Sequence, residues 1–130
     1  MNEHSSDRLV DQRIRNRIME AVETFADGDE GVRSVWPTEY FESFYDWVPH
    51  RDNGGMRQNS AITQDEAALL REVSGILDDA CDATPRNMTP DELIATGWPK
   101  RIQPVACKAL ALMRARGRFS EEMEEEAPSG

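Results

Sequence analysis

One candidate for acid–base chemistry in this sequence is the run His50-Arg51-Asp52, which lies in a polar segment. Histidine is the side chain whose ordinary pKa lies closest to neutrality, and a carboxylate beside it can orient its ring. Side chains that are adjacent in sequence rarely face one another, so a catalytic histidine here would need a partner from elsewhere in the fold. The other histidine, His4, lies in a terminal segment. We therefore expect an ordinary solvated loop.

Two acidic segments raise the question of a metal site. The segment Asp27–Gly31 has the composition of a calcium loop, but Val32 and Thr38 stand where such a loop needs a glycine and a bidentate glutamate. Three aspartates between positions 78 and 82 would need further ligands from other elements to hold Mg²⁺. We expect these aspartates to form a solvated face, near Arg86 or the basic helix, and we expect no metal and no cofactor.

Motifs typical of enzymes are missing from the sequence. It contains no glycine-rich phosphate loop, serine nucleophile motif, HExxH or CxxC. Cys81 and Cys107 are too few and too far apart for a disulfide framework or a zinc site, and we expect buried, reduced thiols. The N-terminus lacks a signal-peptide pattern, and no apolar run is long enough to span a bilayer. These features predict a soluble cytoplasmic protein that is not an enzyme.

The charge of the chain is unevenly distributed. A net charge of −10 argues against a nucleic-acid binder as a whole. Residues 100–118, however, carry six positive charges and no negative one. The segment 90–116 could form a helix-turn-helix pair whose cations contact phosphates. Pro104 stands where the recognition helix should begin, so a DNA-associated regulator is an alternative hypothesis and not the leading one.

Six of the nine aromatic residues fall within twelve positions, from Trp36 to Trp47. Pro37 suits the first turn of a helix, and on a helical wheel the apolar side chains cover about half of the circle. That arc is wider than the roughly 100° stripe of a helix that is buried on one side. We expect this helix to be the hub of the fold. The uncovered part of the arc and the loop after it form a candidate surface for a partner or ligand: Trp36, Tyr40, Tyr45, Trp47, His50 and Arg51.

Helical periodicity predicts an all-α fold, an irregular orthogonal bundle of four or five helices. The first helix starts at Ser6 or Asp7 and ends at Gly28 and Gly31. Asp11 and Arg15, four residues apart beside its apolar face, form a favourable acid-before-base pair. Later helices begin at a Thr63–Glu66 capping box and at Thr89-Pro90, and the most apolar helix, near 101–116, should be central. The predicted organisation is a flexible N-terminus at 1–6, one helical domain at 7–117 and an acidic disordered tail at 118–130.

The leading hypothesis is a non-enzymatic protein–protein interaction module. Its acidic surface favours a basic partner, so the protein could neutralise a basic toxin or nuclease. Two further hypotheses are the DNA-associated regulator and a small-molecule or enzymatic site beside the aromatic helix. A symmetric homodimer is also compatible with the wide apolar arc.

Overall fold

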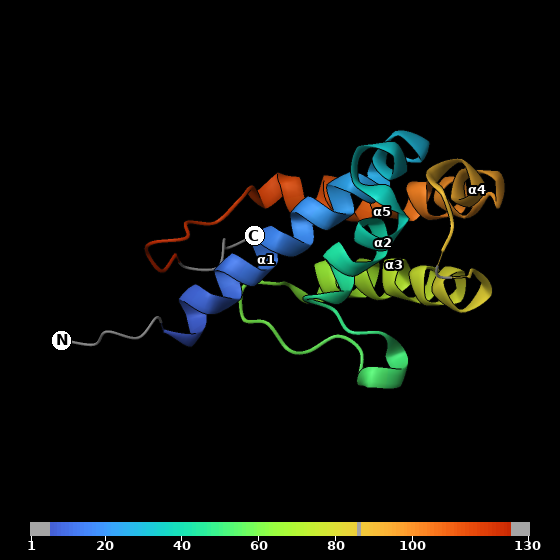
Figure 1. The fold of residues 1–130 in the computed structure, drawn as a ribbon. Coiled ribbons are helices and arrows are strands. Elements are labelled where there is room, and N and C mark those ends of the chain that lie inside the picture. Colours follow the sequence, from blue (N-terminus) through green and yellow to red (C-terminus); the bar gives the residue numbers. More distant parts are fainter. Residues whose placement is uncertain (1–5, 86, 126–130) are drawn as a thin grey trace.

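The computed structural model describes residues 6–85 and 87–125, and these form five α-helices and a short 3-10 turn without a β-strand (Figure 1). The helices are α1 (Asp7–Ala26), α2 (Asp29–Tyr45), α3 (Gln64–Ala83), α4 (Pro90–Ala95) and α5 (Trp98–Arg116), and the turn is η1 (Arg51–Asn53). The prediction of an all-α helical bundle is confirmed. None of these helices combines the length and the apolar character that crossing a membrane requires.

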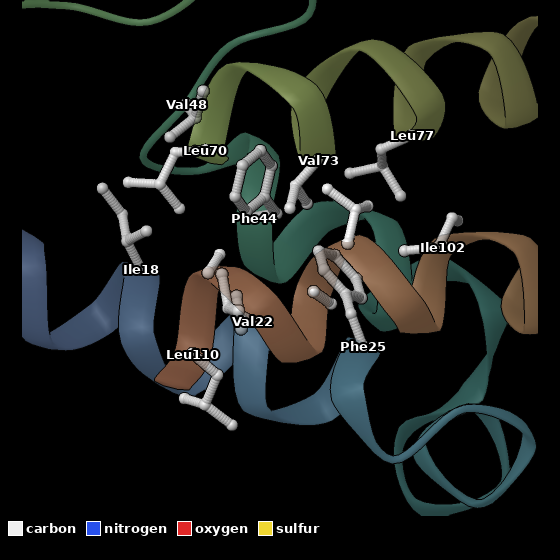
Figure 2. Packing of buried hydrophobic residues seen from close by; sticks show 14 of the residues in the cluster. Ile18, Val22, Phe25, Phe44, Val48, Leu70, Val73, Leu77, Ile102 and Leu110 are labelled. Atoms are coloured by element: carbon white, nitrogen blue, oxygen red, sulfur yellow. The ribbon is translucent and has the colours of Figure 1, made fainter. Parts of the chain in front are cut away.

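The central helix is α5, as its apolar sequence predicts, and the prediction that the aromatic helix is the hub of the fold is wrong. Helix α5 packs against each of the other four helices, most extensively against α1 and α3, while α4 lies at one end of the bundle (Figure 1). Figure 2 shows core side chains from four helices, among them Phe25 of α1, Phe44 of α2 and Leu77 of α3, between the ribbons. The rings of Phe25 and Phe44 lie 5.6 Å apart and join α1 to α2. Burial of these aromatic and aliphatic side chains supplies most of the stabilisation.

Three helices are capped at their N-termini by side chains of residues that the sequence predicts as caps. Ser6 accepts a hydrogen bond from the backbone N–H of Leu9 and caps α1. Thr63 and Thr89 cap α3 and α4, each in a reciprocal capping box with the glutamate three residues later. Ser6, which the sequence assigns to a flexible N-terminus, therefore belongs to the first helix. Residues 1–5 of that predicted terminus lie outside the described residues.

Helix α2 begins eight residues earlier than predicted, at Asp29 instead of Pro37. Gly31, which we expected to help end the first helix, lies inside α2. A Cβ atom at this position would collide with the carbonyl oxygen of Thr24 in α1, so glycine permits a close approach of the two helices. Regular helical geometry is interrupted only at Trp36, with φ 73° and ψ 151°, and resumes at Pro37. The predicted start at Pro37 thus marks the second segment of a longer helix.

A buried carboxylate joins three parts of the fold. The prediction that Asp11 pairs with Arg15 is wrong, because Arg15 is fully buried and its Nη2 lies 2.8 Å from Oε2 of Glu66. Arg116 approaches the other oxygen of Glu66 at 2.6 Å. Asp11 instead accepts hydrogen bonds from the backbone and the hydroxyl of Ser60. Glu66 therefore connects α1, the first turn of α3 and the end of α5.

Residues 118–125, which the sequence assigns to the acidic tail, lie along α1 (Figure 1). Phe119 is buried, and its backbone N–H and carbonyl both bond to the amide of Asn16, at 3.0 and 2.8 Å. Gln12 donates to the carbonyls of Ser120 and Met123, both at 2.9 Å. Buried amides on α1 thus hold the backbone of this segment. Residues 126–130 of the predicted tail lie outside the described residues.

The two cysteines lie on different helices. Cys81 is half-buried on α3, whereas Cys107 is exposed on α5. The prediction that both thiols are buried is wrong for Cys107. This residue belongs to a stripe along the outer side of α5, at the helical spacing of three and four, that also contains Pro104, Lys108 and Ala111.

The backbone of Trp36 generates a stability prediction. Its φ and ψ fall in a region that essentially only glycine occupies, and 64% of the residue is exposed. Replacement by glycine relieves the strain, whereas alanine keeps a Cβ atom on the same backbone, and both remove few contacts. We expect Trp36→Gly to have a free energy of unfolding about 1–3 kcal/mol above that of Trp36→Ala in urea denaturation followed by circular dichroism. Equal stabilities would contradict the strain.

Candidate functional site

The structure separates the six predicted site residues into three groups. Tyr40 lies in the core. Tyr45, His50 and Arg51 meet the aspartates near the end of α3. Trp36 and Trp47 remain on the surface, where they are 64% and 39% exposed. The predicted surface is therefore not one continuous patch, and each group has its own chemistry.

Tyr40 is fully buried, so the prediction that it belongs to an exposed contact surface is wrong. Its ring packs edge-to-face on Phe25, with the ring centres 4.9 Å apart. Burial, with a smaller contribution from the nearby Asp29, raises the pKa of Tyr40 well above its ordinary value. Its role is in the packing of α2 on α1.

Tyr45 donates a hydrogen bond from its hydroxyl to Oδ1 of Asp78, over 2.8 Å. Burial raises the pKa of Tyr45 far above its ordinary value, and the bond to Asp78 raises it further. Asp78 is itself buried and also accepts from the backbone N–H of Arg51, at 3.3 Å. A tyrosine held in this way stays protonated, so it is a poor base or nucleophile.

His50 does find the partner across the fold that its sequence context lacked. Its Nδ1 accepts a hydrogen bond from the backbone N–H of Asp52 at 3.0 Å, which assigns the ring proton to Nε2. Nε2 then donates to Oδ1 of Asp82, over 2.9 Å. Because both nitrogens are engaged within the chain, His50 cannot accept a substrate proton without breaking one of these bonds. This geometry does not favour general-base chemistry.

Arg51 pairs with two of the three clustered aspartates. Its Nη1 lies 3.0 Å from Asp79, and its Nη2 lies 2.7 Å from Asp82. The expected neighbours of these aspartates were Arg86 or the basic helix, but Arg51 and His50 of the preceding loop take that place, and Arg86 lies outside the described residues. No group of metal-binding side chains occurs in residues 6–85 and 87–125. These contacts attach the loop after α2 to α3.

The outer side of α2 carries three exposed acidic residues. Glu39, Glu42 and Asp46 follow one another at a spacing of three and four, which places them on one side of the helix. Within the described part of the chain, their carboxylates make no ion pair or hydrogen bond. In the sequence, the exposed Trp36 precedes this run and the exposed Trp47 follows it. We call these five residues the α2 acidic face.

The α2 acidic face was visible in the sequence but was given too little weight. The helical wheel shows three acids and no base on the polar side of the aromatic helix, whereas our prediction concentrated on the apolar arc. The signal that could have found the face is the absence of lysine and arginine at i±3 and i±4 of these acids.

Neither a family model, nor a curated protein, nor a solved structure matches this chain. Its function therefore has to follow from its own geometry.

The bond between Arg51 and Asp82 predicts a pH dependence of stability. Hydrogen bonds from Arg51 hold the pKa of Asp82 below its ordinary value, with a smaller contribution from His50. Ionised Asp82 therefore contributes stability above about pH 4, the unfolded value, and this contribution is lost as the pH falls through the lower folded pKa. We expect Asp82→Asn to be less stable than wild type at neutral pH, and the difference to shrink on acidification.

Urea denaturation at a series of pH values measures this difference. Glu72→Gln is the matched control, because Glu72 is an exposed acid on the same helix that makes no ion pair in the described part of the chain. Its stability should follow that of wild type throughout. A difference between wild type and Asp82→Asn that stays constant with pH would contradict the ionic contribution.

Proposed function

We propose that this protein is a non-enzymatic interaction module that binds a basic protein partner through the α2 acidic face. The observation that carries the proposal is the run of three carboxylates without partners in the described part of the chain, between two exposed tryptophans. Neutralisation of a basic toxin or nuclease is one version of this function. The proposal includes a cytoplasmic location, which rests on the low cysteine content.

The charges of the chain support this assignment of the surface. On α1, Glu23 lies 2.8 Å from Arg114 at the end of α5, and Glu20 lies 3.0 Å from Arg118 in the segment after that helix. On α3, Asp79 and Asp82 both pair with Arg51. The acids of the α2 acidic face receive no such compensation from the described residues, and the chain as a whole carries a charge of −10. An uncompensated acidic face attracts a basic partner over a distance and selects against acidic ones.

The two tryptophans add contact energy to the charges. Tryptophan is among the side chains that dominate binding energy in protein interfaces. Its ring also attracts the cationic heads of lysine and arginine, which a basic partner supplies. Trp36 and Trp47 could therefore each hold a partner cation at an end of the carboxylate run.

The hypothesis of a DNA-associated regulator has less support. Most of the six cations between residues 100 and 118 have partners within the chain. Lys100 lies 3.7 Å from Asp29, Arg114 and Arg118 pair with acids of α1, and Arg116 pairs with Glu66.

The hypotheses of an enzymatic site and of a homodimer are weakened by the same geometry. An enzymatic site beside the aromatic helix would use Tyr45 and His50, whose polar atoms already bond within the chain. A homodimer was suggested by an apolar arc in need of cover, and α1 and α4 pack against α2 within one chain. We therefore retain the basic partner as the proposal.

The test is the affinity for a lysine- and arginine-rich peptide without tryptophan, measured by the fluorescence of the protein's tryptophans. We expect Glu39→Gln/Glu42→Gln/Asp46→Asn to weaken binding by about tenfold, because three exposed ion pairs are lost.

The matched control is Asp65→Asn/Glu72→Gln/Asp91→Asn, which removes three exposed acids elsewhere that lack partners in the described part of the chain, and which changes the net charge equally. It should weaken binding by about twofold or less, through the general field alone. An equal loss in both variants, or no binding of wild type at low salt, would refute the proposed face.

A further inference from the structure

A groove of about 470 Å³ lies between the chain segment that precedes α3 and the first half of that helix. Its volume is within the range of sites for small molecules, which is roughly 300–1,000 Å³. We propose that this groove binds a small organic anion, with a carboxylate or phosphoryl group on an apolar body. Arg57 and Arg71 would hold the anionic group.

Two arginines give the groove its positive charge. Arg57 and Arg71 are exposed and line the groove. Among the arginines in the described part of the chain, these two alone have side chains that make no hydrogen bond, ion pair or ring contact. The chain has 25 acidic residues, and nearly all of its remaining arginines have a partner within the chain. Guanidinium groups bind carboxylates and phosphates in a bidentate manner, so a pair without partners around one groove fits an anion.

The remaining lining of the groove consists of uncharged polar and apolar side chains. No aspartate or glutamate contributes to it, although such residues are abundant elsewhere. Gln58 and Gln64 add amide groups whose side chains are exposed and make no hydrogen bond in the described part of the chain. Met56, Ile62 and Ala67 supply apolar surface. This combination suits a ligand with an anionic end and an apolar body.

Two apolar residues of the groove also line a second, smaller cavity. A smaller cavity of about 40 Å³ shares Met56 and Ile62 with the groove and is also lined by Trp47, Val48 and Ile18. The body of a ligand whose anion lies between the arginines would have apolar contacts in this direction. The proposal does not depend on the carboxylates of the α2 acidic face, although Trp47 belongs to that face and also lines the smaller cavity.

The experiment is a titration with phenyl phosphate, benzoate and, as a neutral control, benzyl alcohol, followed by calorimetry and by the side-chain amide signals of Gln58 and Gln64 in NMR spectra. We expect both anions to bind and to shift these signals, and benzyl alcohol to do neither. Tighter binding of phenyl phosphate would indicate a phosphorylated ligand, and tighter binding of benzoate would indicate a carboxylate. Equal binding of benzyl alcohol, or no binding of either anion, would overturn the proposal.

Substitution of the arginines locates the binding site. Arg57→Gln/Arg71→Gln should weaken the affinity for the anions by about tenfold or more, because charge-assisted hydrogen bonds are lost. Arg33→Gln/Lys108→Gln removes two exposed cations elsewhere and should change it by about twofold or less. Circular dichroism checks that both variants fold. An equal effect of the two variants would assign the binding to general charge and overturn the proposed site.

Discussion

The structure depends on one buried carboxylate, that of Glu66. Two guanidinium groups approach it, from Arg15 of α1 and Arg116 of α5, and both Arg15 and Glu66 have no exposed side-chain area. A buried charge is tolerated only where partners and hydrogen bonds replace water. Arg15 also donates to the carbonyls of Met113 and Gly117, at 3.0 and 2.7 Å. The end of α5 is therefore fixed against α1 and α3 with little freedom in position.

The internal pairing of arginines determines which charged side chains on the surface remain available for a ligand. Guanidinium groups from α5 and from the loop after α2 are engaged with acids of α1 and α3. Among the described residues, the acids on the outer side of α2 are left without partners, and so are Arg57 and Arg71 at the groove. At each of the two proposed sites, several like charges without internal partners therefore occur together. Their opposite charges predict two different classes of ligand.

Local signals predicted much of the fold, and non-local contacts explain what they missed. Capping residues such as Thr63 and Thr89 act within one helical turn, so their sequence spacing was sufficient. The burial of Arg15 was not predictable in this way, because its partner Glu66 is 51 residues away. The wheel of α2 gave the width of its apolar arc but not which part the other helices cover. Hence Tyr40 was wrongly assigned to the surface, and the partner of His50 was not foreseen.

The central claim, that the ion pair of Glu66 fixes the fold, is tested most directly by a double-mutant cycle of Arg15→Met and Glu66→Leu in urea denaturation. Arg15→Met leaves Glu66 with Arg116 as its remaining guanidinium partner, whereas Glu66→Leu leaves the buried Arg15 without a carboxylate and should cost about 3–5 kcal/mol. The double variant should cost no more than Glu66→Leu alone. Costs that add to within about 0.5 kcal/mol would contradict the claim, because independent residues behave in that way.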